Sequence, residues 1–181
     1  MPNHFDLVIL GGGCAGLSLA TELAHLGDTG PHTVVLESRK TYSHDRTWCY
    51  FKDARAATRA DAQHTWQSMR VASVAANVAF DCGSACYEMV NAGQFYKNAV
   101  STIRTSAHID LKLGLEVTQA PKKQNGLWRI DTDVGALYAP YVVDTRPAQR
   151  PRSDGAKLLQ SFYGQEIECE ADTFDSACGD L

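Results

Sequence analysis

Three glycines near the start of the chain have the spacing of a dinucleotide-binding turn. Gly11, Gly13 and Gly16 form the pattern G-x-G-x-x-G, with Gly12 and Ala15 between them. In such a turn the first glycine allows the sharp bend, the second lets a diphosphate approach the main chain, and the third lets a helix pack on a strand. Backbone N–H groups at the helix N-terminus favour the negative charge of the diphosphate. We therefore expect this turn to bind an ADP-containing dinucleotide.

The residues around the turn predict the strand–turn–helix–strand unit that such a site needs. Residues 5–10 predict an apolar strand, and residues 17–26 predict a helix that ends at Gly27 as its C′ residue. Residues 33–37 predict a second, β-branched strand that closes on Glu37. This acid follows the last glycine by about 20 residues, where a carboxylate binds the adenosine ribose. A glycine-rich loop without a ligand fits this context less well.

The position of the turn bears on the choice between cofactors. A fingerprint so close to the N-terminus is typical of FAD-dependent proteins, although NAD-dependent enzymes share the same turn. After Glu37 the alternation of strand and helix stops, and residues 38–59 are polar and irregular. An ordinary nicotinamide dehydrogenase would continue with another helix and strand. We therefore prefer FAD to NAD.

The composition describes ordinary globular material. The 181 residues are 44% hydrophobic and 21% charged, and the net charge of −4 without any basic run argues against a nucleic-acid partner. The N-terminal apolar run lacks a basic leader, so we do not interpret it as a signal peptide. No stretch approaches the ~20 apolar residues that span a bilayer. We expect a cytoplasmic protein, in which any contact with the inner face of the membrane is peripheral.

The cysteines lack the paired spacing and the histidine spacing of zinc sites. We therefore expect reduced thiols and no metal, with Cys14 as a small packing residue within the glycine turn. A disulfide or metal site at Cys82 and Cys86 is the less favoured alternative. The six cysteines are Cys14, Cys49, Cys82, Cys86, Cys169 and Cys178.

The middle of the chain predicts strands followed by one helix. Residues 66–80 fit one or two strands, and residues 87–90 fit another short strand. Asn91 followed by Gln94 is a capping-box pattern, which marks the start of a helix. Its apolar stripe is formed by Phe95, Ala99 and Ile103, flanked by Tyr96 and Val100.

Residues after this helix alternate as strands of a sheet. The predicted strands cover residues 109–113, 115–118, 127–131 and 136–143, and Asn125-Gly126 predicts a hairpin between the second and third. Residues 157–170 predict a further strand, in a separate sheet. Its acids could hold a metal, but a solvated face is the favoured interpretation. They are Glu166, Glu168 and Glu170.

These patterns together predict an α/β chain. We expect a Rossmann-like FAD/NAD(P)-binding fold in residues 1–150, with residues 52–90 as an inserted segment. We expect residues 151–181 to begin a second, β-rich substrate domain. Because these residues are too few to complete such a domain, we predict that the chain is truncated.

Several short motifs resemble the bacterial lycopene cyclases of carotenoid biosynthesis, which belong to a wider class of hydroxylase-type FAD proteins. The matching pieces are residues 5–20, His-Asp-Arg-Thr-Trp at 44–48, Val-Asp-Thr-Arg-Pro at 143–147, residues 162–168 and residues 172–175. The His-Asp-Arg-Thr-Trp piece and the Gly-Gln-Glu within 162–168 point to cyclases in particular. The resemblance runs along the whole chain and is poorest between residues 52 and 85.

The resemblance implies roles for individual residues. The glycine turn would hold the FAD diphosphate and Glu37 the ribose. Arg46 would lie by the phosphates or the flavin edge, Val117 would offer backbone groups to adenine, and Asp144 would support the diphosphate. A surface arginine, a plain strand valine and a turn cap are the respective alternatives. Trp48 would face a polyene cavity or, as we favour, lie in the core.

The resemblance also implies a reaction, an isomerisation in which each ψ-end of lycopene closes to a β-ionone ring. A carboxylic acid protonates the substrate, and reduced FAD, supplied with electrons by NAD(P)H, stabilises the carbocation without net redox chemistry. The apolar substrate would arrive from the membrane. The acid of this family lies in a Phe-Leu-Glu-Glu-Thr-type motif that these 181 residues lack.

We therefore assign no catalytic residue and expect no turnover from this chain alone. Whether the chain as given is an enzyme stays open at this point. Two other interpretations also stay open: another FAD-dependent oxidoreductase of the monooxygenase or prenyl reductase type, and a non-catalytic dinucleotide-binding fragment.

Overall fold

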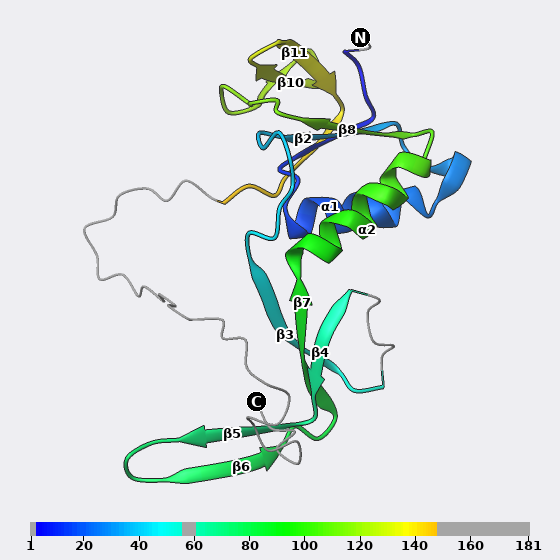
Figure 1. The fold of residues 1–181 in the computed structure, drawn as a ribbon. Coiled ribbons are helices and arrows are strands. Elements are labelled where there is room, and N and C mark those ends of the chain that lie inside the picture. Colours follow the sequence, from blue (N-terminus) through cyan, green and yellow to red (C-terminus); the bar gives the residue numbers. More distant parts are fainter. Residues whose placement is uncertain (1–2, 56–60, 148–181) are drawn as a thin grey trace, which may run out of the picture. The chain divides into compact units, whose positions relative to one another are not determined.

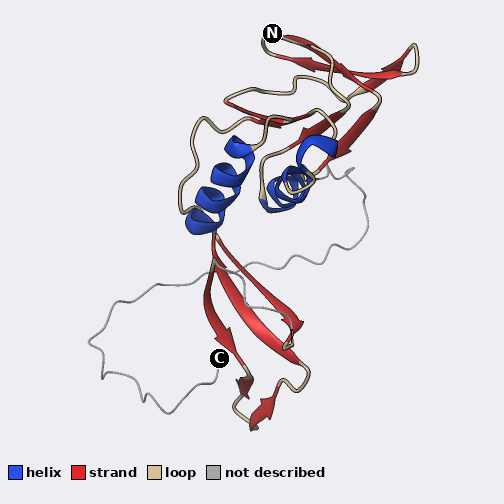
Figure 2. Cartoon of the chain, turned by 90° about the vertical axis from the view of Figure 1, so that its right-hand side faces the viewer, coloured by secondary structure: helices blue, strands red, loops and turns tan. Residues whose placement is uncertain are grey.

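The computed structural model describes residues 3–55 and 61–147, which fall into two units (Figure 1). The first unit contains residues 3–49, 61–63 and 89–147, and the second contains residues 50–55 and 64–88. Among the described residues, both α-helices belong to the first unit (Figure 2). Neither of them is long and apolar enough to cross a membrane.

A four-stranded parallel sheet forms the centre of the first unit. Its strand order is β12-β1-β2-β8, and the register places Leu10, Leu36 and Asp144 side by side at the carboxyl ends of three strands. Carboxyl ends of parallel strands are where this class of fold binds ligands. The strands are β1 (Leu7–Leu10), β2 (Thr33–Glu37), β8 (Ile109–Leu113) and β12 (Tyr141–Asp144).

Two helices pack against each other and against this sheet (Figure 1). Helix α1 (Cys14–Ala24) follows β1 through the glycine turn, and α2 (Ala92–Thr105) precedes β8. The expected stripe of α2 is buried, because Phe95, Ala99 and Ile103 are each at most 5% exposed. This part of the sequence-based prediction is confirmed.

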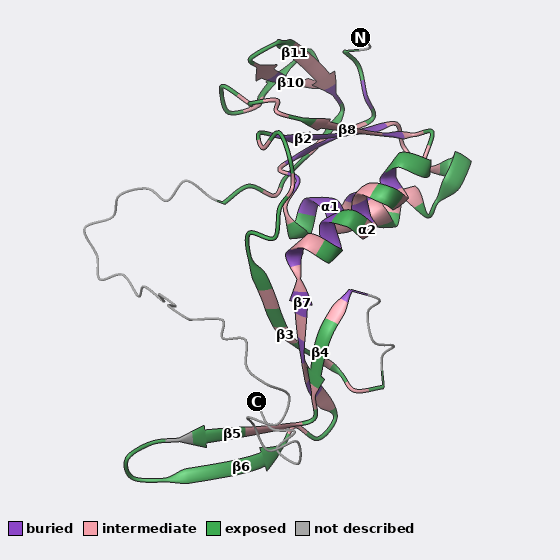
Figure 3. Ribbon diagram, viewed as in Figure 1, coloured by how far each residue is buried: buried purple, intermediate pink, exposed green. Residues whose placement is uncertain are grey.

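A three-stranded antiparallel sheet packs through its apolar side chains against β1 and β2. Its order is β11-β10-β9, and its members are β9 (Lys122–Gln124), β10 (Leu127–Thr132) and β11 (Gly135–Ala139). The apolar cluster at this contact is buried (Figure 3). It consists of Phe5, Val8, Leu10, Val34, Leu36, Ile130 and Ala139.

The second unit is built from strands. Strands β3 (Thr47–Asp53), β7 (Ala85–Asn91) and β4 (Ala62–Trp66) form a sheet in the order β3-β7-β4. The first residues of β3 and β4 and the last residues of β7 are counted in the first unit. Strands β5 (Ser68–Ala72) and β6 (Asn77–Asp81) form a hairpin whose described side chains are mostly exposed (Figure 3). Residues 66–80 therefore contain two strands, the second of the two options left by the sequence.

Helix boundaries differ from the prediction at α1. The helix starts at Cys14, within the turn, rather than at residue 17, because the last glycine of the fingerprint is already helical. It ends with His25 as C-cap, and Gly27, at φ +56°, opens the short 3₁₀ helix η1 (Gly27–Thr29) instead of serving as the C′ residue. The predicted N-cap of α2 is confirmed, since Asn91 Oδ1 accepts the backbone N–H of Gln94 at 3.1 Å.

Three strand predictions need correction. Residues 136–143 form two strands, because Pro140 interrupts them and has no N–H to donate to a ladder. Residues 115–118 contribute only a single bridge at Val117, so the hairpin turn at Asn125-Gly126 joins β9 to β10. Residues 38–59 are not wholly irregular, because β3 lies within them.

The second half of the capping box at α2 is also absent. The side-chain amide of Gln94 donates to Asn98 Oδ1 at 2.9 Å rather than turning back to the N-cap residue. Both amides are exposed, so this local pair competes with the capping geometry at little cost. The predicted strand over 157–170, its three glutamates, Cys169, Cys178 and the start of a second domain at 151–181 lie outside the described residues.

Candidate dinucleotide-binding site

The glycine turn has the conformation that its spacing predicts. Gly11 lies at φ +98°, a region that side chains disfavour, and a Cβ on Gly16 would collide with the carbonyl oxygen of Gly11. A Cβ on Gly13, by contrast, would have nothing within 4 Å. Gly13 is also the N-cap of α1 and provides no side-chain cap for its N–H groups. The turn is therefore tightly packed on the protein side and open where a diphosphate would approach.

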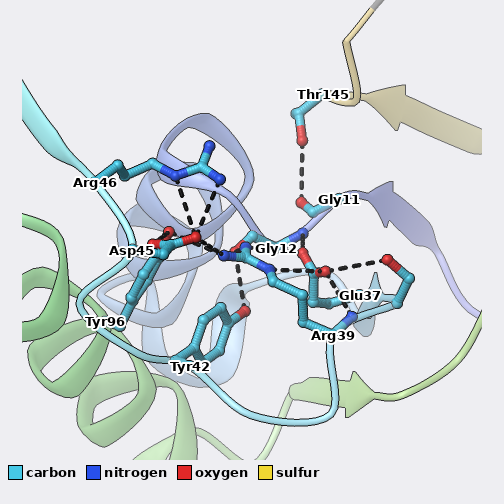
Figure 4. Close-up of polar contacts among 10 residues, drawn as sticks. Gly11, Gly12, Glu37, Arg39, Tyr42, Asp45, Arg46, Tyr96 and Thr145 are labelled. Atoms are coloured by element: carbon cyan, nitrogen blue, oxygen red, sulfur yellow. Dashed lines mark hydrogen bonds and ion pairs between the residues drawn. The ribbon is translucent and has the colours of Figure 1, made fainter. Parts of the chain in front are cut away.

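Glu37, the last residue of β2, turns its carboxylate to this turn. Its Oε2 accepts the backbone N–H of Gly12 at 2.8 Å, and only 6% of the residue is exposed (Figure 4). Burial would raise the pKa of Glu37, but hydrogen bonds from Arg39 and Gly12 and the charge of Arg39 outweigh it, so the pKa lies below its ordinary value. Glu37 is therefore an ionised acceptor at neutral pH.

Arg39 lies at the centre of the polar contacts behind the turn (Figure 4). Its guanidinium donates to both carboxylate oxygens of Glu37 at 3.1 Å and to the carbonyl of Gly12 at 3.1 Å. It also lies over the rings of Tyr42 and Tyr96, 4.9 and 5.2 Å from their centroids. Such stacked, forked contacts hold a guanidinium in one place.

The two tyrosines connect α2 and the loop after β2 to the same turn. Their rings stack with centroids 4.4 Å apart, and the Tyr42 hydroxyl donates to the carbonyl of Gly12 at 2.9 Å. Burial, followed by the nearby charge of Glu37, raises the pKa of Tyr42, so its hydroxyl stays protonated as a donor. A groove of about 950 Å³ along α2 has both tyrosines and His44 in its wall.

Asp45 and Arg46 bring the His-Asp-Arg-Thr-Trp segment to this network. Arg46 donates through Nε and Nη2 to Asp45 Oδ2 at 3.2 and 3.0 Å, and its side chain is 56% exposed. Arg39 Nη1 donates to the same oxygen at 3.2 Å. The predicted site residue Arg46 thus lies next to the network, paired with an acid and accessible to solvent.

The end of β12 closes the other side of the turn. The Thr145 hydroxyl lies within hydrogen-bond distance of the carbonyl oxygens of Leu10 and Gly11, at 2.9 and 3.0 Å. Asp144 accepts the backbone N–H and the guanidinium of Arg146, which lowers the pKa of this carboxyl. Asp144 therefore forms a local turn with Arg146 in this structure, which fits the turn-cap alternative.

Two other residues singled out from the sequence make packing contacts. Val117 bridges to Thr132 and packs against the apolar cluster between the two sheets. Trp48 packs edge-on against Phe95 and Tyr96, with centroids 5.2 and 5.7 Å away. Trp48 therefore lies against the helix core.

Cys82, Cys86 and possible metal ligands were the remaining alternatives from the sequence. Cys82 and Cys86 are both unbridged thiols. Within residues 3–55 and 61–147, no group of three histidine, cysteine, aspartate or glutamate side chains is arranged to hold a metal ion.

Sequence reasoning missed the residues that organise the site. Arg39 and Tyr42 contact Gly12 or Glu37, and Tyr96 contacts Arg39 and Tyr42 in turn. None of the three belongs to the glycine fingerprint. One available signal was the nearness of Arg39 to the strand-ending acid, two positions away on the same chain segment. Tyr96 could not be found in this way, because α2 joins the site only through tertiary packing.

The described residues fit a bound dinucleotide. The open N-terminus of α1 at Gly13 can accept a diphosphate, the carboxylate of Glu37 can accept ribose hydroxyls, and Arg46 offers an exposed positive charge beside them. An ionised Glu37 would repel a phosphate on the ribose 2′-position. The arrangement thus suits a dinucleotide with a free adenosine ribose.

A comparison with protein families gives one match. The family model described as "Lycopene cyclase protein" matches residues 6–181, nearly the whole chain. No curated protein matches the sequence at a significant level.

The solved structures with similar folds include monooxygenases and a hydroxylase. A p-nitrophenol 4-monooxygenase from Pseudomonas putida is 18% identical, with a TM-score of 0.63 over 83% of this chain and 42% of that one. PqsL, a probable FAD-dependent monooxygenase from Pseudomonas aeruginosa, is 15% identical, with a TM-score of 0.58 over 77% and 42%. The anhydrotetracycline hydroxylase OxyS from Streptomyces rimosus is 21% identical, with a TM-score of 0.56 over 78% and 31%.

These likenesses show the fold of this chain and the share of each solved structure that the chain spans. The predicted Rossmann-like α/β fold of the hydroxylase-type flavoproteins is confirmed. The chain spans less than half the length of each of these structures.

Proposed function

Because this chain belongs to the lycopene cyclase family, we propose that it binds FAD and serves the non-redox cyclisation of lycopene ψ-ends to β-ionone rings. One observation carries the proposal. The segment at residues 44–48 is connected to the dinucleotide turn through Arg39, which donates both to Asp45 and to the carbonyl of Gly12. A family-specific motif and a general cofactor motif thus form one network.

The proposed FAD binding gives individual residues of this chain specific contacts with the cofactor. Gly11, Gly12, Gly13, Ala15 and Gly16 would hold the diphosphate, with N–H groups of the turn and of the first residues of α1 as donors. Glu37 would bind the adenosine ribose, and Arg46 would pair with a phosphate. Val117 and Asp144 stay proposals for adenine and diphosphate contacts, although both have local partners in this structure.

The chemical part depends on the cofactor and on residues that we do not assign here. Reduced FAD, kept reduced by electrons from NAD(P)H, supplies a fixed negative charge beside a carbocation in an apolar pocket. This chain's residues would orient the cofactor and keep it in place. Lycopene has no polar atoms, so we propose that it reaches the protein from a membrane contacted peripherally on its cytoplasmic side. No described residue is proposed as the acid that protonates the substrate.

A second function deserves a test because the similar structures are monooxygenases. Another FAD-dependent oxidoreductase, of the monooxygenase or prenyl reductase type, would use the same turn and Glu37. The difference between the two functions lies in the product. A cyclase forms an isomer of lycopene, whereas an oxidoreductase adds oxygen or hydrogen to its substrate.

Expression of the protein at its full natural length in cells that accumulate lycopene tests the proposal. We expect pigments with β-ionone rings and the mass of lycopene, together with purified protein that carries FAD. Pigment that stays entirely lycopene, in the presence of FAD-loaded protein, would contradict the cyclase assignment and favour the oxidoreductase. Protein that neither binds FAD nor changes the pigment would contradict both functions.

A further inference from the structure

We propose that Arg39 is a positioning residue, which holds Glu37 and Asp45 in place so that Arg46 can turn to the cofactor's diphosphate. The inference rests on the proposed FAD binding and adds a residue to that site. It gives different roles to Arg39 and Arg46, which both donate to the carboxylate of Asp45. Arg39 stays fixed, and Arg46 moves.

The contacts of the two arginines differ sharply. Arg39 donates to Glu37, Asp45, Tyr96 and the Gly12 carbonyl, and it lies over two tyrosine rings. Within the described part of the chain, the Arg46 guanidinium donates only to Asp45, and more than half of the side chain is exposed. The cost of moving Arg39 would therefore be large, whereas an exposed ion pair such as that of Arg46 contributes little to stability.

The shared oxygen explains why Arg46 can leave. Both guanidinium groups donate to Asp45 Oδ2, Arg39 at 3.2 Å and Arg46 at 3.0 Å (Figure 4). When Arg46 turns away, Asp45 keeps the donor from Arg39 and a second one from the Tyr96 hydroxyl, which lies 3.3 Å from Oδ1. Asp45 is thus not left without a counter-charge, a state that would otherwise oppose the movement.

Loss of Arg39 would prevent Arg46 from leaving Asp45. Asp45 would then depend on Arg46 for its positive partner, and Arg46 would be held away from the diphosphate. Glu37 would lose the two guanidinium donors to its carboxylate and would keep only the weaker, uncharged donors around it, among them the backbone N–H groups of residue 39 and Gly12. Both changes lower the affinity for FAD, but only the first can be relieved by removing the charge of Asp45.

This difference gives a suppressor test, with the FAD dissociation constant of the full-length protein as readout. We expect R39M to weaken FAD binding about tenfold to a hundredfold, because the paired, charge-assisted hydrogen bonds from the guanidinium to Glu37 are lost. Adding D45N to R39M should recover about threefold to tenfold of the affinity, since Arg46 is released, and D45N alone is measured so that its own effect can be subtracted. R39K, which keeps the charge but not the fork, should lie between wild type and R39M.

The pH profile of FAD binding is a second readout that a merely structural role would not move. The groups facing Glu37 are the Gly12 N–H, Arg39, the Ser38 hydroxyl and the Tyr42 hydroxyl, with Asp45 and Tyr96 beyond Arg39. Without the Arg39 guanidinium, Glu37 loses a hydrogen bond and a positive charge that oppose the effect of burial, so the pKa of Glu37 rises relative to the wild type. Affinity in R39M should therefore begin to fall at a higher pH than in the wild type as the solution is acidified.

Lys40 provides the matched control. It is an exposed cation beside Arg39 in the sequence, and K40M removes the same charge from the same loop. We expect K40M to bind FAD as the wild type does, and thermal unfolding of each apoprotein checks that it is folded. If R39M/D45N binds FAD no better than R39M, or if the pH profile does not shift, the inference is overturned while FAD binding stands. A wild-type protein that does not bind FAD overturns the proposed function together with this inference.

Discussion

The backbone N–H of Gly12 donates to Glu37 Oε2 at 2.8 Å, across 25 positions of sequence. This bond connects the middle of the glycine turn to the end of the neighbouring strand. The N–H group of Gly12 therefore already has an acceptor within the protein. If FAD binds as proposed, we therefore expect Gly11 and Gly12 to shape the turn around the diphosphate, and the N–H groups from Gly13 onward, at the N-terminus of α1, to be its main donors.

Glu37→Gln should weaken FAD binding about tenfold, because an amide accepts ribose hydroxyls less strongly than a carboxylate does. Isothermal titration with FAD would measure the change. Glu22→Gln, at an exposed acid of α1, is the control with the same change of charge and should have no effect. Equal affinities of E37Q and wild type would remove Glu37 from the site.

Gly13 and Gly16 should respond in opposite ways to substitution. Gly16→Ala places a methyl group against the Gly11 carbonyl and should lower the free energy of unfolding by about 1–3 kcal/mol, even without cofactor. Gly13→Leu has open space around the new side chain and should leave the apoprotein nearly as stable as wild type. It should nevertheless reduce FAD retention strongly, because the side chain fills the approach to the main chain. Normal FAD retention by G13L would contradict the location of the site.

Thr145→Val removes the hydroxyl that bridges the end of β12 to the glycine turn. Loss of its interactions with the Leu10 and Gly11 carbonyls should make the variant about 1 kcal/mol less stable, because partly buried acceptors lose a donor. Thr145→Ser keeps the hydroxyl and should retain most of the stability. Chemical denaturation of the three proteins measures the difference, and equal losses in both variants would point to the methyl group instead.

Acid should abolish the contribution of Glu37 to stability. Its folded pKa lies below the unfolded value of about 4.3, so the contribution is complete above that value and is lost as the pH falls through the folded pKa. Thermal midpoints of wild type and E37Q should therefore differ at pH 7, and the difference should shrink as the pH falls below the unfolded value of about 4.3. A constant gap across this range would show that the carboxylate charge is not the stabilising feature.

How far the sequence anticipates the fold depends on how local each signal is. The turn at Gly11, the strand ending at Glu37 and the stripe on α2 follow from neighbouring residues, and the structure has all three. Strand β3 was missed because its exposed and half-buried residues alternate without an apolar face that stands out in the sequence.

The site was anticipated only where its residues share the fingerprint. Arg39 meets Tyr96 across 57 positions, a contact that exists only because α2 packs beside α1. Arg46 was expected near the phosphates, but its pairing with Asp45, shared with Arg39, depends on the path of the loop after β2. Tertiary packing, rather than any local pattern, determines these contacts.

A buried ion pair in the second unit gives the last prediction. Glu88 on β7 is fully buried, with the Tyr50 hydroxyl donating to Oε1 at 2.6 Å and Lys52 Nζ 3.0 Å from Oε2. Lys52→Met leaves that carboxylate without its positive partner and should cost about 3–5 kcal/mol. Lys52→Met combined with Glu88→Leu removes both charges and should restore much of the loss, since paired removal avoids a stranded charge. Denaturant unfolding of the two variants and the wild type decides the matter: a double variant less stable than K52M would show that the pair itself, rather than its balance of charge, maintains this sheet.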